Sequence, residues 1–213
     1  MGTRVYLVRH SETVLTTEER FAGSTDVELS DAGRAQARRL SERLKGETFA
    51  AVYASPLSRA KETAAIVAAP HRMEPQLVPD LREIGHGRWE GLTRAEVEAR
   101  FGDEFSRWEE DPFGFAPVGG ETGASVLARA LPALREIVDL HGRKGKKILV
   151  VSHKATIRLL ACGLIGIDPR GYRDKLELLP ASLSIVEFKS TPPRARLARW
   201  NDVTHLEGAA GAP

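Results

Sequence analysis

The chain has 213 residues, of which 42% are hydrophobic, enough for a sizeable core in one α/β unit. Its 31 Lys and Arg and 29 Asp and Glu are interspersed and leave a formal net charge of +2, which excludes a basic arm or stripe for nucleic acid. The single cysteine excludes a disulfide framework within the chain, and the apolar stretch at 157–167 is too short to span a bilayer.

The first half of the chain predicts two strands, each followed by a helix. The apolar runs at 5–8 and 49–54 are short, as in the buried strands of a parallel sheet. A Ser-Asp-Ala-Gly cap predicts a helix over 30–45, and a proline predicts the start of a second helix over 56–69. This order of elements is typical of an α/β fold.

Residues 80–122 predict an irregular insert. The proline and glycine residues at 112–120 favour a loop at its end over a helix or strand. We interpret the insert as a cap over a site. It is rich in aromatic side chains, namely Trp89, Phe101, Phe105, Trp108, Phe113 and Phe115.

The second half predicts helices at 124–141 and 154–165 on either side of a short apolar strand at 148–151. The alternation of apolar and polar residues at 183–188 predicts a half-buried strand, with an antiparallel partner at 194–200.

Together these elements predict an α/β fold, a three-layer α/β/α sandwich around a mostly parallel sheet. We expect one catalytic domain over 1–206, with the cap insert at about 80–122. Residues 207–213 are expected to be a disordered tail.

Three of the predicted strands are followed closely by basic or imidazole side chains. Arg9 and His10 follow the first strand, Arg59 follows the second, and His153 follows the third. The carboxyl ends of parallel strands meet at one edge of the sheet, where α/β folds bind ligands. Guanidinium groups bind phosphate oxygens in pairs, so Arg9 and Arg59 are expected to hold a phosphoryl group.

The chemistry of imidazole predicts different roles for the two histidines. Adjacent cations favour the uncharged ring, so His10 beside Arg9 is expected to attack phosphorus at neutral pH. His153 would serve best protonated, as a donor to the same phosphoryl oxygens. A strand-end histidine that bonds only to backbone is the alternative for both.

Departure of an alkoxide from phosphorus needs a proton, which a carboxyl group in a partly apolar site can supply. Glu83 is the candidate for this proton donor, and Glu12, Glu90 and Glu121 are the alternatives. His86, in the same segment as Glu83, is expected either to line the cap or to be solvated.

Five segments in register from Val5 to about Leu206 resemble the successive signatures of the histidine phosphatase superfamily. The resemblance is to its phosphoglycerate-mutase-like branch and, within it, to phosphatases of broad specificity. The segments are Arg-His-Ser-Glu-Thr at 9–13, Ser-Pro-Leu-Ser-Arg-Ala-Lys-Glu-Thr-Ala at 55–64, Leu-Arg-Glu-Ile-Gly-His-Gly-Arg-Trp-Glu-Gly at 81–91, Gly-Gly-Glu-Thr at 119–122 and Val-Ser-His at 151–153.

The resemblance implies a role for each matching residue. It implies a phosphohistidine at His10, phosphate contacts from Arg9, Arg59 and His153, and a proton donor at Glu83. It also implies that no metal is needed.

The chain departs from the family's pattern at four positions. Ser11 stands where glycine is usual, and we expect it either to bond the phosphate or to tolerate the turn. Thr16 and Ala22 stand where asparagine and glutamine are frequent on the rim of the site. Lys154 follows the second histidine, where a small residue is common, and this cation favours a substrate with a second anionic group.

The sequence therefore predicts a phosphoric monoester hydrolase of the histidine acid phosphatase type, acting on a small phosphorylated metabolite without a cofactor. A cofactor-dependent phosphoglycerate mutase and an inactive relative that only binds phosphorylated ligands are the alternatives. The six histidines lack metal-ligand spacing, so no metal site is expected. We expect a cytoplasmic protein with no signal peptide and no nucleic-acid or membrane partner, and the sequence leaves monomer and homodimer open.

Overall fold

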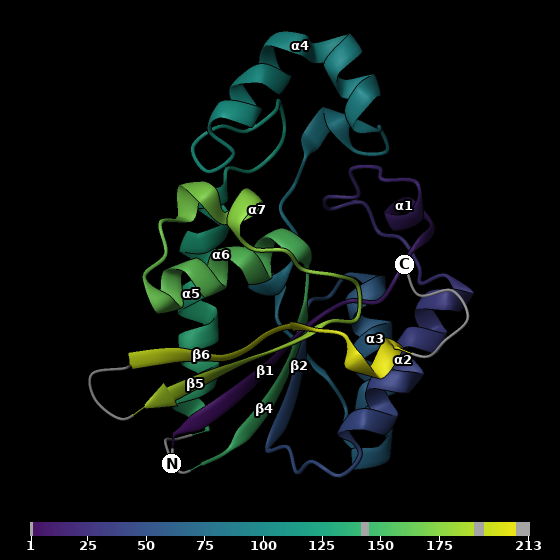
Figure 1. Cartoon of the computed structure of the whole chain (residues 1–213), viewed down its shortest axis with the longest axis vertical. Coiled ribbons are helices and arrows are strands. Elements are labelled where there is room, and N and C mark those ends of the chain that lie inside the picture. Colours follow the sequence, from purple (N-terminus) through teal and green to yellow (C-terminus); the bar gives the residue numbers. More distant parts are fainter. Residues whose placement is uncertain (1, 142–144, 190–193, 208–213) are drawn as a thin grey trace.

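The computed structural model describes residues 2–141, 145–189 and 194–207. Within these residues the strands form one sheet in the order β3-β2-β4-β1-β5-β6 (Figure 1). The first four strands in the chain run parallel, and β5 pairs antiparallel with both β1 and β6, so the predicted α/β sheet is confirmed. The strands are β1 (Thr3–Arg9), β2 (Ala51–Ala54), β3 (Gln76–Leu77), β4 (Lys147–Ser152), β5 (Leu183–Lys189) and β6 (Arg194–Asp202).

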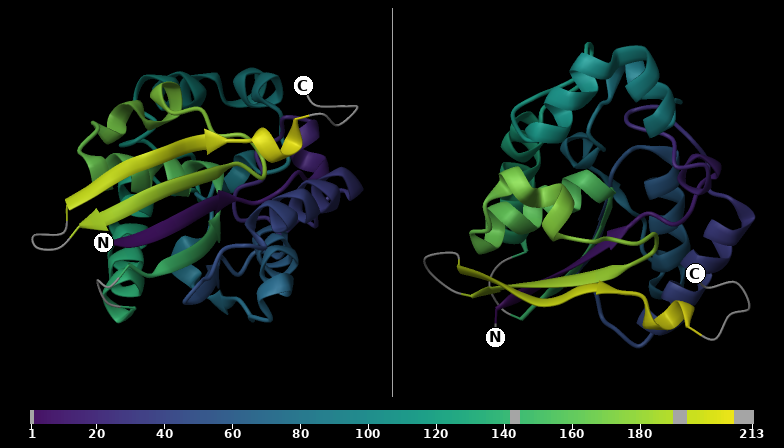
Figure 2. Two further views of the ribbon diagram at one scale, coloured as in Figure 1. Left: turned by 60° about the horizontal axis from the view of Figure 1, so that its bottom comes forward. Right: turned by 45° about the horizontal axis from the view of Figure 1, so that its top comes forward.

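Helices cover both faces of the sheet, which makes the three predicted layers (Figure 2). Side chains alternate along a strand, so β1 sends Tyr6 and Val8 into the core under α2 and α3, and Val5 and Leu7 into the core under α5 and α6. The bounds are α1 (Val14–Thr17), α2 (Asp31–Leu44), α3 (Ser58–Ala68), α4 (Arg94–Glu110), α5 (Gly123–Leu140), α6 (Lys154–Ile165) and α7 (Tyr172–Lys175).

The register of the sheet brings the ends of three strands together. Arg9 at the end of β1 lies beside Ser152 at the end of β4. The chain continues this pairing past the strands, because the amide of His10 donates to the carbonyl of Ser152 at 2.9 Å and that of Ser55 to the carbonyl of Val151 at 3.0 Å. The residues that follow β1, β2 and β4 are therefore neighbours.

The prediction of an irregular insert at 80–122 is wrong, because the insert contains the long helix α4. Thr93 and Glu96 form a capping box, in which each side chain accepts a hydrogen bond from the backbone N–H of the other residue. The helix is kinked at Phe101 (φ −138°, ψ 40°), and its apolar face packs with Trp89 in a separate small core. Figure 1 shows α4 at the end of the molecule opposite the N-terminus.

The four predicted helices match α2, α3, α5 and α6 closely, with one shift at α3, whereas the short helices α1 and α7 were not predicted. This helix begins at Ser58 rather than at residue 56, because Leu57 is extended (φ −64°, ψ 135°). Asp26 accepts hydrogen bonds from the amide and the hydroxyl of Ser58, both at 2.7 Å, and so anchors the first turn. The two-residue strand β3 is too short to leave a periodic signal in the sequence.

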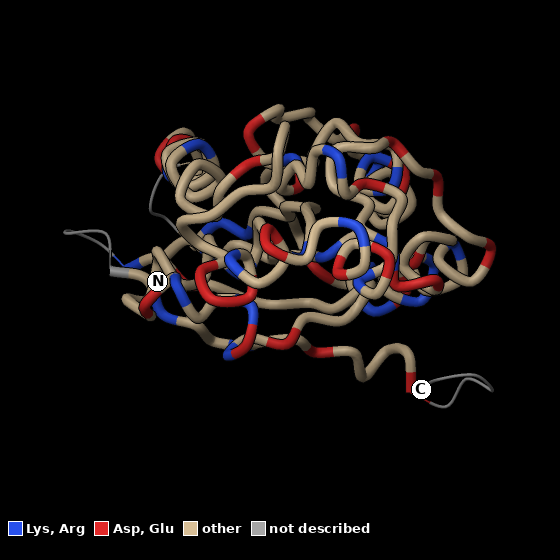
Figure 3. Tube along the Cα trace, turned by 90° about the horizontal axis from the view of Figure 1, so that it is seen from above, with Lys and Arg blue, Asp and Glu red and all other residues tan. Residues whose placement is uncertain are grey.

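Basic and acidic residues alternate along the described chain without a long run of one sign (Figure 3). The assignment of 1–206 to one catalytic domain stays a prediction. Apart from Glu207, the tail predicted at 207–213 lies outside the described residues.

Candidate active site

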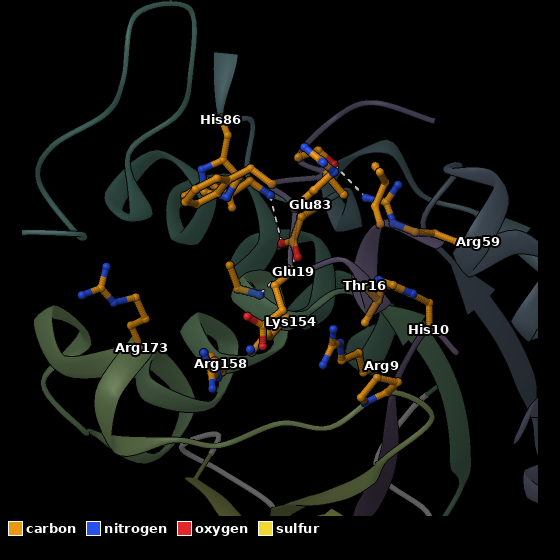
Figure 4. Close-up of a pocket in the computed structure, with 18 of the residues that line it drawn as sticks. Arg9, His10, Thr16, Glu19, Arg59, Glu83, His86, Lys154, Arg158 and Arg173 are labelled. Atoms are coloured by element: carbon orange, nitrogen blue, oxygen red, sulfur yellow. Dashed lines mark hydrogen bonds between the residues drawn. The ribbon is translucent and has the colours of Figure 1, made fainter. Parts of the chain in front are cut away.

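A cavity of about 510 Å³ opens at the carboxyl ends of the strands (Figure 4). The ends of the strands, the loop at 15–23, α6, α7 and the cap line this cavity. Predicted site residues in its wall are Arg9, His10, Arg59, Glu83 and Lys154, together with the two rim positions Thr16 and Ala22. Ser11 and His153 are fully buried and are not part of the wall.

His10 has a ring orientation that leaves one nitrogen free to react. Its Nδ1 lies 2.7 Å from the carbonyl oxygen of Ser11. A carbonyl can only accept, so Nδ1 carries the proton and Nε2 keeps its lone pair. Burial, together with the charges of Arg59 and Arg9, holds the pKa of His10 well below its ordinary value, as expected for a neutral nucleophile.

Two buried arginines are fixed beside His10 by backbone carbonyl groups. Arg59 is 1% exposed and donates to the carbonyl oxygens of Thr25 at 2.8 Å and Gly23 at 2.7 Å. Arg9 donates to the carbonyl oxygen of Leu178 at 2.7 Å. Burial lowers the pKa of Arg9 to about 10, so it still carries a positive charge at neutral pH. Such fixed cations can stabilise an anion without having to reorganise.

His153 lies against His10, with ring centroids 5.1 Å apart, and its surroundings disfavour the protonated ring. Burial and the neighbouring His10, Arg59 and Arg9 hold its pKa well below the ordinary value. Its Nε2 lies 2.7 Å from the hydroxyl of Ser55, and its Nδ1 is buried with no partner among the described residues. If Ser55 donates to Nε2, the neutral ring keeps its proton on Nδ1, where it can be donated to a ligand.

Ser11 does not reach the cavity wall. Its amide donates to the hydroxyl of Thr63 at 3.1 Å, and its own buried hydroxyl has no partner among the described residues. A contact between Ser11 and phosphate stays a prediction.

Glu83 is held at the first turn of α6. Its Oε1 accepts from the amides of Ile84 at 3.0 Å and Thr156 at 3.3 Å, and its Oε2 accepts from the amide of Ala155 at 3.3 Å. The side chain is 9% exposed, and it faces the cavity. These contacts fix a carboxyl group on the same cavity as His10.

The three alternative carboxylates lie outside the cavity wall and have structural partners. Glu12 accepts from the hydroxyl of Ser30 at 2.8 Å, and Glu121 pairs with Arg129 at 2.9 Å. Glu90 accepts from the amides of Ser24 and Thr25 at 2.9 Å each, and so holds the loop whose carbonyl groups bind Arg59. Burial raises the pKa of Glu90, but hydrogen bonds from Thr25 and Ser24 outweigh it and the pKa lies below the ordinary value.

His86 lines the cavity instead of being solvated. Its ring packs against Phe21 with centroids 4.7 Å apart and against Trp108 at 6.1 Å. Burial lowers the pKa of His86, so the ring belongs to an aromatic wall of the cavity rather than to its cationic part.

Sequence reasoning missed a group of basic side chains that line the cavity away from the strand ends. Arg158 follows Lys154 by four residues on α6, a spacing that places both on one helix face. This spacing could have identified Arg158 from the sequence. Arg173 on α7 and Arg94 on α4 carried no such signal. Glu109, on α4 with Arg94, pairs with both at 2.8 Å.

The described residues contain no group of three or more His, Cys, Asp or Glu side chains that could hold a metal ion. Nor does any helix in the described segments have the length and apolar character needed to cross a membrane.

Known proteins resemble this chain over most or nearly all of its length. It is 34% identical over 165 residues to phosphoserine phosphatase 1 of Hydrogenobacter thermophilus, which covers 78% of this chain and 77% of that protein. It is 36% identical over 211 residues to phosphoglycerate mutase-like protein 4 of Arabidopsis thaliana, covering 95% and 86%. Among solved structures, that of Bacillus stearothermophilus YhfR superposes with a TM-score of 0.89 at 33% identity, covering 96% of this chain and all of the other.

The family model of the histidine phosphatase superfamily (branch 1) matches residues 5–203. This range includes every residue of the site and both layers of helices. The chain therefore belongs to branch 1 of the histidine phosphatase superfamily.

Proposed function

We propose that the protein hydrolyses small phosphate monoesters through a phosphohistidine at His10. The observation that carries this proposal is the free lone pair on Nε2 of His10, between the two buried guanidinium groups of Arg9 and Arg59. In this proposal the enzyme is a phosphoric monoester hydrolase of the histidine acid phosphatase type.

In the first step Arg9 and Arg59 hold the phosphoryl group, and Nε2 of His10 attacks phosphorus opposite the ester oxygen. The P–O bond breaks as the P–N bond forms, and protonated Glu83 gives its proton to the departing alkoxide. Nδ1–H of His153 donates to a phosphoryl oxygen, whose charge the guanidinium groups also offset.

In the second step Glu83, now a carboxylate, takes a proton from water. The resulting hydroxide attacks phosphorus and breaks the P–N bond, which releases inorganic phosphate and restores the neutral ring of His10. Glu83 is protonated again and ready for the next substrate.

The substrate in this proposal is a small phosphorylated metabolite, a size that the cavity of about 510 Å³ can enclose. The similarity to a phosphoserine phosphatase supports hydrolysis. The similarity to a phosphoglycerate mutase-like protein keeps a cofactor-dependent mutase as the second candidate, since a mutase shares the first step but returns the phosphoryl group to a sugar acid.

One assay separates the candidates. The protein is incubated with 3-phosphoglycerate, phosphoserine and glycerol 3-phosphate, with and without 2,3-bisphosphoglycerate, and both released phosphate and 2-phosphoglycerate are measured. We expect released phosphate that does not depend on bisphosphoglycerate. Interconversion of the phosphoglycerates that requires bisphosphoglycerate would replace the proposal by a mutase, and binding without turnover would indicate an inactive relative.

A further inference from the structure

Two cations on α6 line the cavity without a carboxylate partner. Lys154 and Arg158 form no hydrogen bond or ion pair with any other side chain that the structure describes. Each of the remaining cations in the cavity wall outside the phosphate site has a carboxylate partner, since Arg20 pairs with Glu96 at 2.9 Å, and Arg94 and Arg173 share Glu109 at 2.8 Å from each.

Arg158 is the more unusual of the two, because it is only 7% exposed. Its Nε is buried and has no partner within the described segments. A buried charge without a partner is costly, and two like charges one helical turn apart repel each other. The fold therefore keeps at this place a guanidinium group whose hydrogen-bond donors are available to a ligand.

The surroundings of Lys154 also disfavour its charged form, although Glu83 and Glu177 act in the opposite direction. Burial, and then the charges of Arg9 and Arg158, lower the pKa of Lys154 to about 8. Burial is also the main cause that lowers the pKa of Arg158. An anion bound between these groups would offset their repulsion.

The position of this pair relates it to the phosphate site. Figure 4 shows Lys154 and Arg158 beyond Arg9, on the side away from Arg59. Arg9, Lys154 and Arg158 all line the same cavity. One ligand can thus place a phosphoryl group at His10 and a second anionic group on α6.

We propose that Lys154 and Arg158 bind a second anionic group of the substrate, which makes the enzyme selective for phosphate monoesters whose alcohol carries a carboxylate or a further phosphate. This inference rests on the proposed function and defines the substrate class of that site. The strand-end arginines bind the group that is transferred, and the pair on α6 binds the part that leaves.

The first test compares three substrates of the wild-type protein. Glycerol 3-phosphate and 3-phosphoglycerate differ only by a hydroxymethyl group in place of the carboxylate, and glycerol 1,3-bisphosphate carries a second phosphate. We expect kcat/KM to be about tenfold to a hundredfold higher for at least one of the two substrates with a second anionic group, the range of a hydrogen bond to a charged group. Which of the two is preferred identifies the group as carboxylate or phosphate.

The second test removes the cations one at a time. Lys154→Met and Arg158→Met should each lower kcat/KM for the preferred substrate about tenfold to a hundredfold and leave that for glycerol 3-phosphate within about twofold. Arg158→Lys keeps the charge and should restore part of the selectivity. The matched controls are Lys61→Met and Arg135→Met, exposed helix residues outside the cavity, which should change neither substrate.

The outcomes separate this inference from the proposed function. If the protein releases phosphate from none of the three substrates and not from p-nitrophenyl phosphate either, the proposed function is wrong. Turnover of glycerol 3-phosphate as efficient as that of both other substrates would overturn the inference and leave the phosphatase in place. So would variants at Lys154 and Arg158 that slow all substrates equally. The wild-type comparison does not depend on whether Arg158→Met folds.

Discussion

Two walls of the same cavity are built in different ways. The wall at the strand ends carries Arg9, His10 and Arg59, and backbone carbonyl groups of Leu178, Ser11, Thr25 and Gly23 fix their side chains. The wall on α6 carries Lys154 and Arg158, whose side chains have no such partners among the described residues. The wall of Arg9, His10 and Arg59 is therefore called the rigid wall, and the wall of Lys154 and Arg158 the α6 wall. Fixed side chains suit a reaction that is the same for every substrate, whereas unpaired cations suit recognition of the part of the substrate that varies.

The largest effect should come from the rigid wall. His10→Ala removes the nucleophile, so kcat should fall at least about 10³-fold for any phosphate monoester. A brief reaction with ³²P-labelled substrate, quenched in alkali, should leave an acid-labile and base-stable label on the wild type and none on the variant. A label that persists on His10→Ala would contradict the assignment of the nucleophile.

Glu83 faces the same cavity from the first turn of α6, and the effect of replacing it should depend on the leaving group of the substrate. Glu83→Gln keeps the shape of the side chain but cannot give up a proton. The rate should fall about 10²–10⁴-fold for 3-phosphoglycerate and far less for p-nitrophenyl phosphate, whose phenolate departs without help. Steady-state kinetics with both substrates measure this difference.

The controls for Glu83 are Glu12→Gln and Glu90→Gln. Glu90 holds the loop that binds Arg59, so its variant should slow both substrates alike. If either control slows 3-phosphoglycerate far more than p-nitrophenyl phosphate, another residue is the acid. The same follows if Glu83→Gln slows both substrates equally.

The sequence predicted the residues of the rigid wall far better than those of the α6 wall. Short apolar strands followed by polar residues are a local signal, and the parallel register then forces Arg9, His10 and His153 together. The lowered pKa of His153 was not predicted, because it depends on burial and on charges from three other segments. Such a sum over distant groups has no local signature.

The cap and the α6 wall show where sequence reasoning could have gone further. The capping box of Thr93 and Glu96 marks the start of α4, and the aromatic residues were instead interpreted as part of an irregular insert. Arg158 could have been paired with Lys154 by helical spacing. The ion pair of Glu109 with Arg173 joins segments 64 residues apart and could not be predicted from spacing, whereas Arg94 lies on α4 together with Glu109.

The α6 wall should also respond to pH within the range of ordinary assays. The pKa of Lys154 is lowered to about 8 by burial and by Arg9 and Arg158, against the opposite influence of Glu83 and Glu177. Its charge is therefore present below pH 8 and lost as the pH rises through that value. The ratio of kcat/KM for the preferred substrate to that for glycerol 3-phosphate should fall several-fold, by less than about tenfold, between pH 7 and 9.

The ratio isolates Lys154 because titration of His10 and of the arginines affects both substrates equally. Lys154→Arg supplies a cation that keeps its proton throughout this range and should make the ratio independent of pH. A ratio that falls equally in the wild type and in Lys154→Arg would assign the pH dependence to another group.

The smallest effect expected is that of a chelator, which tests whether the rigid wall supplies all of the positive charge that phosphoryl transfer needs. Arg9 and Arg59 are fixed and buried, and they carry charge at the place where a metal ion would otherwise stabilise the phosphoryl oxygens. Dialysis against EDTA should therefore leave kcat and KM unchanged for both 3-phosphoglycerate and p-nitrophenyl phosphate. A zinc-dependent alkaline phosphatase treated in the same buffer is the control that shows effective chelation. Loss of activity that magnesium or zinc restores would mean that the two arginines do not suffice, and the division of labour between the walls would then have to include a metal ion.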